Sequence, residues 1–73
     1  MKIRTQDAKQ YLEYGEAYTA YCGGRSAVFV RTRYQPKSVL AGTYEDEERS
    51  KGVLYEMGMA YKNHERIYYM PAV

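Results

Sequence analysis

A glycine pair, Gly23-Gly24, divides the most regular segment of the chain, residues 16–34, into two runs of alternating side chains. Glycine tolerates the positive φ angles that a tight two-residue hairpin turn requires, and alternation with a period of two is typical of half-buried strands. Counting outward from the turn predicts these facing pairs: Cys22 with Arg25, Tyr21 with Ser26, Ala20 with Ala27, Thr19 with Val28, Tyr18 with Phe29, Ala17 with Val30 and Glu16 with Arg31. The segment therefore predicts an antiparallel hairpin at the centre of a sheet.

Two of these pairs support the predicted register independently of the turn. Tyr18 faces Phe29, and Glu16 faces Arg31 on the same side of the hairpin. Aromatic pairs and opposite-charge pairs on neighbouring strands each stabilise a sheet by about 0.2 to 1 kcal/mol. Alternation then predicts that Val28, Val30 and Tyr34, which occupy the intervening positions, face the other way.

Shorter segments on both sides of the hairpin are also predicted to be strands. Residues 1–6 alternate, a turn follows at 7–9, and residues 10–14 form a weaker strand. A proline-containing loop at 35–38 precedes a short strand at 39–44, which a glycine interrupts. The sheet is therefore expected to contain about five or six strands.

A single helix is predicted in the second half of the chain. Asp46 is a favourable N-cap, Thr43 is a competing one, and two glutamates follow where the helix dipole favours anions. A stripe at helical spacing is expected to pack on the sheet: Ser50, Val53, Leu54, Met57, Ala60 and Tyr61. Basic residues end the helix, Asn63 can adopt the left-handed cap conformation, and residues 66–70 form a final strand.

These elements predict one small domain that spans residues 1–73. A chain of 73 residues buries only about 60% of the surface that its unfolded form exposes, so a large internal cleft is not expected. The predicted fold class is α+β: a single antiparallel sheet of about five or six strands, one helix packed on it, and a strand after the helix.

Composition places the chain among globular proteins and sets its expected compartment. The formal charge is +2, well below the basic excess of a dedicated nucleic-acid binder. One cysteine cannot form an internal disulfide, and the polar N-terminus leads into no apolar run of signal or membrane length. We expect a cytoplasmic protein without a membrane association. Ten tyrosines fit either a thin sheet-rich core or a binding surface.

No catalytic, cofactor or metal site is expected from the residue types present. One cysteine and one histidine are too few for a zinc site, and Cys22 beside a turn has no feature that would activate its thiol toward His64. The acidic run at 45–48 is what a helix N-terminus prefers, and no phosphate-binding glycine motif follows a strand. The sequence therefore predicts a protein that is not an enzyme and uses neither metal nor cofactor.

Two groups of residues are candidates for contact with a partner. One face of the hairpin combines guanidinium groups with aromatic rings, which suits phosphates, stacked bases or an acidic protein surface, although a solvated polar face has the same composition. Its members are Tyr18, Arg25, Phe29, Arg31 and Arg33. Tyr55 and Met59 share the helix face opposite the core stripe and are candidates for a subunit or partner interface.

The two ends of the chain resemble a group of small uncharacterised proteins from phages, plasmids and other mobile elements of Firmicutes. The resemblance is carried by the opening segment 1–7 and by Leu40-Ala41-Gly42-Thr43-Tyr44, Glu48-Arg49, Val53-Leu54, Ala60-Tyr61 and Tyr69-Met70-Pro71. It implies a strand, helix, strand ending and a mobile-element origin. Glu45-Asp46 stands where such proteins have serine or threonine before the helix, and the group supplies no activity or functional residue.

Two functions remain open at this level. The first is a non-enzymatic phage or mobile-element protein that binds a host protein or nucleic acid through the arginine-rich face, for example a counter-defence inhibitor. The alternative is an oligomer that binds a nucleotide or another small ligand between its subunits. A homo-oligomer is compatible with both functions.

Overall fold

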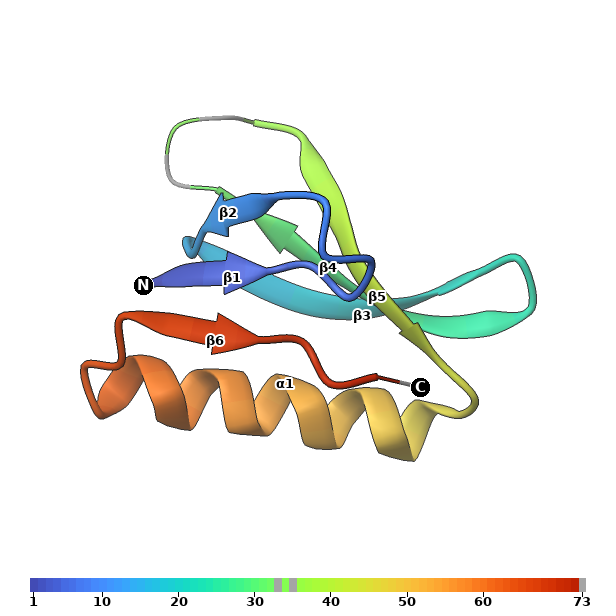
Figure 1. The fold of residues 1–73 in the computed structure, drawn as a ribbon. Helices are drawn as coiled ribbons and strands as arrows, with labels where there is room; N and C mark the ends of the chain where they lie inside the picture. The colour runs from blue at the N-terminus through green and yellow to red at the C-terminus, as the bar shows by residue number, and fades with distance from the viewer. Residues whose placement is uncertain (33, 35, 73) are drawn as a thin grey trace.

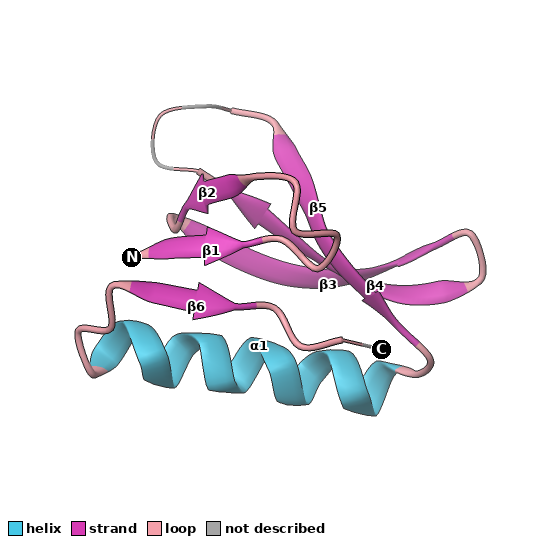
Figure 2. Cartoon of the chain, in the orientation of Figure 1, coloured by secondary structure: helices cyan, strands magenta, loops and turns pink. Residues whose placement is uncertain are grey.

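The described residues of the computed structural model, 1–32, 34 and 36–72, form six strands and one helix (Figure 1, Figure 2). Arg33, one of the predicted partner-binding arginines, lies outside the described residues. The helix is α1 (Glu47–Lys62), and the strands are β1 (Lys2–Arg4), β2 (Tyr11–Glu13), β3 (Glu16–Cys22), β4 (Arg25–Arg31), β5 (Ser38–Tyr44) and β6 (Ile67–Tyr69). The predicted α+β class, with one helix and a strand after it, is confirmed.

The strands are divided between two three-stranded sheets, whereas a single antiparallel sheet was expected. The larger sheet has the order β3-β4-β5 and is antiparallel, and the smaller has the order β2-β1-β6. In the smaller sheet β1 pairs antiparallel with β2 but parallel with β6. Figure 1 shows why: α1 returns the chain to the end of the molecule where β1 begins, so β6 runs in the same direction as β1.

The central hairpin has the register that the sequence predicts. All the facing pairs from Cys22 with Arg25 to Glu16 with Arg31 are present between β3 and β4. Gly23 and Gly24 have φ angles of 62° and 80°, which place both residues in the left-handed region that a two-residue turn needs. The turn and the alternation together were sufficient to predict this register.

The molecule has two layers with one core between them. In Figure 1 the smaller sheet and α1 lie on the same side of the larger sheet, and α1 packs against β3, β4 and β5. Buried core side chains come from β1, β2, β4, β5 and α1 together with Met70, and Ala17 of β3 and Tyr68 of β6 pack against them in partly buried positions. These buried core residues are Ile3, Leu12, Val28, Val30, Ala41, Tyr44, Val53, Met57 and Met70.

The helix begins where the sequence predicts, and the left-handed residue at its end lies one position later than expected. The Asp46 carboxylate accepts a hydrogen bond from the Arg49 N–H at 2.8 Å, so Asp46 and not Thr43 is the N-cap. At the other end Asn63 has a φ of −86°, and His64 adopts the left-handed conformation with a φ of 61°. The expectation that Asn63 would adopt that conformation was therefore wrong by one residue.

The buried side of the helix is narrower than the predicted stripe. Ser50, Val53 and Met57 are fully buried, whereas Leu54 is partly buried and Tyr61 is 46% exposed. The Ser50 and Ser26 hydroxyls lie 2.6 Å apart, which satisfies two polar groups inside the core. Val28 and Val30 face the helix layer as expected.

Tyr34 is not part of the core, because β4 ends at Arg31 and the alternation ends with it. Its side chain is 77% exposed, unlike the buried side chains of Val28 and Val30.

Candidate binding surfaces

The outer face of the larger sheet is not covered by α1 or by the smaller sheet, both of which lie on its other side (Figure 1). Alternation along β4 turns Ser26, Val28 and Val30 toward the core, where all three are buried. Phe29 and Arg31 therefore project from the outer face, as the sequence predicts. This face carries both aromatic and charged candidate residues.

A row of apolar side chains crosses the outer face, with one residue from each strand. Tyr18 of β3 lies opposite Phe29 of β4, and Phe29 lies opposite Leu40 of β5. The Tyr18 and Phe29 rings are stacked, with centroids 5.6 Å apart and planes 17° from parallel. Tyr18 remains 44% exposed and Leu40 42% exposed, so the row presents apolar surface to solvent. We call these three residues the outer row.

Sequence reasoning found Tyr18 and Phe29 but missed Leu40. The loop before β5 is not a tight turn, so residues on β5 cannot be placed opposite β4 by counting. In addition, the pairing shifts between Val28, which faces Gly42, and Phe29, which faces Leu40. This irregularity places an extra residue in β5 and changes which side chains point outward.

The two described arginines of β4, Arg25 beside the turn and Arg31 near the outer row, have different surroundings. Arg31 forms an ion pair with Glu16, and both side chains are at least half exposed. An exposed pair of this kind contributes about 0 to 1 kcal/mol to stability. On Arg25 the Nε and Nη2 atoms are buried, and neither has a hydrogen-bond partner among the described residues.

The described charged residues of this face carry a small net charge. Arg25 and Arg31 are positive and Glu16 is negative, so these residues together carry an excess of one positive charge. Phosphate-binding surfaces neutralise several phosphates at once and need a larger basic excess. The outer face therefore combines exposed apolar area with a small net charge among its described residues.

Tyr55 and Met59 are exposed on the helix, as predicted. Tyr55 is 70% exposed and Met59 39% exposed, and they lie one helical turn apart. They are on the side of α1 away from Ser50, Val53 and Met57, so they belong to a surface separate from the outer row.

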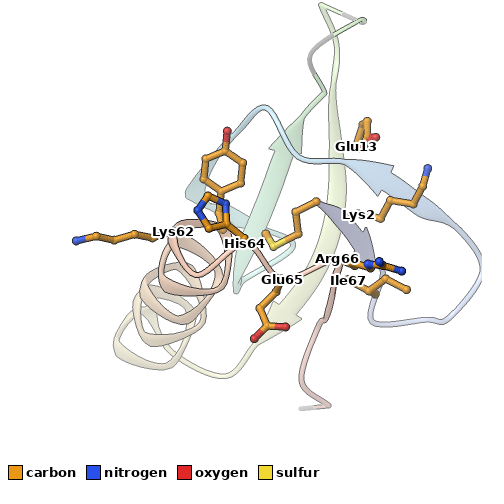
Figure 3. A pocket seen from close by; sticks show the side chains of 9 residues that line it. Lys2, Glu13, Lys62, His64, Glu65, Arg66 and Ile67 are labelled. Atoms are coloured by element: carbon orange, nitrogen blue, oxygen red, sulfur yellow. The ribbon is translucent and has the colours of Figure 1, made fainter.

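An open groove, which sequence reasoning missed, lies between the C-terminal end of α1 and the smaller sheet. Its volume is about 700 Å³, and it is lined by Met1, Lys2, Glu13, Tyr61, Lys62, His64, Glu65, Arg66 and Ile67. Figure 3 shows Lys62 and His64 on one side of the groove and Lys2 and Glu13 on the other. No motif marks this site, because its residues come from β1, β2, the end of α1 and the start of β6.

The groove carries charges of both signs, with basic groups in the majority. Lys2, Lys62 and Arg66 are positive, whereas Glu13 and Glu65 are negative. In the described part of the chain no ion pair joins any of them, so the charges remain available to a ligand. The Tyr61 ring lies against the Tyr14 ring, with centroids 4.9 Å apart, and fixes one wall.

The titration of two partly or fully buried tyrosines is shifted by the packing of the layers. Burial raises the pKa of the Tyr68 hydroxyl far above its ordinary value, and the Glu56 carboxylate, to which this hydroxyl donates a hydrogen bond, raises it further. Burial also raises the pKa of Tyr44, whose hydroxyl donates to the Pro71 carbonyl at 2.9 Å. Both hydroxyls are thus held in their neutral form and act as structural donors.

Cys22 and His64 are placed at opposite ends of the molecule. Cys22 adjoins the turn between β3 and β4, and His64 lies in the connection from α1 to β6 (Figure 1). They cannot form a nucleophile and base pair in one subunit. Within the described ranges, no group of three or more His, Cys, Asp and Glu side chains is arranged to hold a metal ion.

In the described part of the chain, α1 is too short and too polar to span a membrane. No family model, curated protein or solved structure matches this sequence. The surfaces themselves are therefore the basis for assigning a function.

Proposed function

We propose that this protein is a non-enzymatic binding protein that recognises a macromolecular partner through the outer face of the larger sheet. The observation that carries the proposal is the outer row, Tyr18, Phe29 and Leu40, whose stacked aromatic rings and aliphatic side chain remain accessible to solvent. Exposed apolar residues that gather on one face mark sites of protein–protein contact.

A protein partner is favoured over a nucleic acid by the charge of the face. Glu16 neutralises Arg31, which leaves little of the positive potential that attracts a phosphate backbone. Leu40 offers an aliphatic contact that suits a protein surface, whereas single-stranded nucleic acids stack on aromatic rings.

The setting that we propose is a phage or mobile element whose protein binds a host protein, with a counter-defence inhibitor as one example. The support for this setting is the resemblance of the two ends of the chain to small mobile-element proteins. Gene neighbourhood tests it directly: a cassette of phage or conjugation genes around the coding sequence is the expected result.

The binding proposal is tested by isolating the copurifying partner and measuring its affinity for defined variants. The double variant Phe29→Ser with Leu40→Asp removes apolar contact from the outer row, and Arg31→Glu reverses an exposed charge two residues from Phe29 on β4. Each is expected to weaken binding at least tenfold while the protein remains folded, because the replaced atoms are partly exposed. Nuclease treatment before capture distinguishes a protein partner from a nucleic acid.

A matched control lies on the other exposed surface. Tyr55→Ser with Met59→Ser removes a similar apolar area from α1 and should leave the affinity unchanged. If this control abolishes binding and the outer-row variants do not, the partner binds the helix and the assignment is wrong.

The groove beside α1 supports a second candidate function, the binding of a small anionic ligand such as a nucleotide. The specific observation is the concave shape of the groove, about 700 Å³, in which three basic side chains form no ion pair with any described residue. Denaturing the purified protein and measuring ultraviolet absorbance of the released filtrate would detect a nucleotide. Loss of that signal in Lys62→Glu with Arg66→Glu, but not in the outer-row variants, would identify the groove as its site.

A further inference from the structure

The larger sheet ends at β3 in a strand edge to which no other described segment is hydrogen-bonded. β3 is the outermost strand of the order β3-β4-β5 and extends over Glu16–Cys22. Among the described residues, no backbone hydrogen bond joins 16–22 to any segment other than β4. A strand of this length with unpaired N–H and C=O groups is a template for pairing with another strand.

The opposite edge of the same sheet is protected. The Gln6 N–H donates to the Ala41 carbonyl at 2.8 Å. The Gln6 side-chain amide also donates to the Thr43 carbonyl at 3.0 Å and accepts from the Thr43 N–H at 2.9 Å. In the smaller sheet, β2 and β6 are only three residues long, which itself limits pairing. The β3 edge is therefore the long open edge of the described structure.

The tight turn determines which backbone groups point outward from β3. In a two-residue hairpin the residues that flank the turn, here Cys22 and Arg25, form a hydrogen-bonded pair. Hydrogen-bonded and non-hydrogen-bonded pairs then alternate along an antiparallel ladder. Consequently the N–H and C=O groups of Ala17, Thr19 and Tyr21 point away from β4 toward the open edge.

The side chains along this edge are complementary to a second copy of the same strand. When two β3 strands run antiparallel about Thr19, Thr19 faces Thr19, Tyr18 faces Ala20 and Ala17 faces Tyr21. Each tyrosine then lies opposite an alanine, so large side chains are accommodated by small ones. Residues 17–21 contain neither a charge nor a proline, which are the residues that usually prevent pairing at sheet edges.

We propose that two copies of this chain pair antiparallel through β3, centred on Thr19, and form a continuous sheet of six strands, three from each copy. A two-fold axis at this position is perpendicular to the sheet, as in isologous dimers. The outward groups of Thr19 pair with those of Thr19 in the second copy, and those of Ala17 pair with those of Tyr21.

The charges on α1 are complementary in this arrangement. Because α1 packs on the inner face against β3, the two-fold axis brings both helices to the same side of the joined sheet, running antiparallel. The acidic N-terminal end of one helix, with Glu47 and Glu48, then faces the end of the other that carries Lys62. Opposite charges at adjoining helix ends favour this orientation over a parallel one.

Pairing through β3 also joins the outer faces of the two copies. Tyr18 of each outer row lies beside Ala20 of the other copy, so the exposed apolar surface becomes continuous across the dimer. The dimer can be tested independently of the proposed partner, because the mass of the purified protein is measured with no partner present.

Sedimentation equilibrium of the wild type over a range of concentrations tests the pairing. The expected mass is twice the 8.5 kDa of one chain. Thr19→Pro removes an outward N–H and leaves the hydrogen bonds to β4 in place, so the variant should fold, by circular dichroism, and sediment as a single chain. A wild-type mass of one chain at millimolar concentration, or a folded Thr19→Pro variant that still dimerises, would overturn the proposal.

One cysteine introduced into each copy tests the register of the pairing. It also tests whether the dimer forms if Thr19→Pro does not fold. In a Cys22→Ser background, Thr19→Cys places two Cα atoms about 5.5 Å apart across the axis, within disulfide range. Tyr18→Cys is the matched control, because its Cα atoms would be about 8 Å apart. Oxidised glutathione should link the Thr19→Cys chains at least tenfold faster. Equal rates, or faster linking of the control, would contradict the proposed pairing.

Discussion

At the scale of single residues, Gly42 leaves little room for a side chain. A Cβ atom there would lie 3.1 Å from the Tyr44 hydroxyl oxygen, 3.2 Å from Gln6 Cβ and 3.3 Å from the terminal methyl of Met70. These neighbours belong to three different segments, which meet where the smaller sheet approaches β5. The absence of a side chain at Gly42 thus allows the two layers to approach each other.

We predict opposite effects for alanine at two glycines. Gly42→Ala should lower the free energy of unfolding by about 1 to 3 kcal/mol, because its neighbours must move to accommodate the methyl group. Gly52→Ala adds the same methyl group on α1, where no described residue beyond the adjoining helix backbone and chain neighbours lies within 4 Å of the new atom, and should raise stability by about 1 kcal/mol. Urea unfolding measures both, and equal effects would contradict the packing around Gly42.

Met57 and Leu54 should respond differently to the same substitution. Met57 is fully buried, so Met57→Asp places an unpaired charge in the core at a cost of several kcal/mol. This approaches the total stability of about 4 to 11 kcal/mol expected for a chain of this size. Leu54 is only partly buried, so Leu54→Asp should lower the melting temperature without abolishing the folded state. A Met57→Asp variant as stable as Leu54→Asp would show that the helix is rotated from this position.

At the scale of elements, two neutral tyrosine hydroxyls donate hydrogen bonds in the region where α1 and the two sheets meet. Tyr68 of β6 donates to Glu56 of α1 at 3.2 Å, and the pKa of Tyr68 is raised by burial and by that carboxylate. The pKa of Tyr44 is raised by burial, an effect that the Arg49 guanidinium partly opposes. A pH high enough to ionise these hydroxyls therefore removes hydrogen bonds in the region where α1 and the sheets meet.

We predict that stability falls as the pH rises above about 10, the ordinary tyrosine pKa. Since the pKa values of Tyr44 and Tyr68 are higher in the folded state, the unfolded state loses its protons first, and the free energy of unfolding decreases from that pH upward. Tyr68→Phe removes one of these groups and should reduce the slope of stability against pH. Tyr55→Phe, at an exposed tyrosine, is the matched control; a Tyr68→Phe slope equal to that of the wild type would exclude this linkage.

At the scale of the whole molecule, the two sheets share one core and should unfold together. Ile3 and Leu12 of the smaller sheet pack with Val28 and Val30 of the larger one and with Met57 of α1. Separation of the layers would expose both sets of side chains at once, which favours a cooperative transition. Far-ultraviolet and near-ultraviolet circular dichroism should therefore give the same urea midpoint. Two separated midpoints would indicate that β1, β2 and β6 unfold as an independent unit.

Local sequence determined the elements whose interactions are close along the chain. The pair Gly23-Gly24 and the alternation around it determine the β3–β4 register, since a two-residue turn leaves one way to count. Asp46 determines the start of α1 because its carboxylate accepts a hydrogen bond three residues later. Tyr18, Phe29 and Arg31 were assigned to the outer face by the same alternation.

Contacts between segments distant in the sequence were decided only by the tertiary structure. The separation into two sheets and the parallel pairing of β6 with β1 depend on where α1 returns the chain, which no local pattern encodes. Leu40 joins the outer row through a shifted pairing, and the groove near Lys62 gathers residues from both ends of the chain. Turns and alternation act over a few residues, whereas the sharing of one core by both layers determines how distant segments meet.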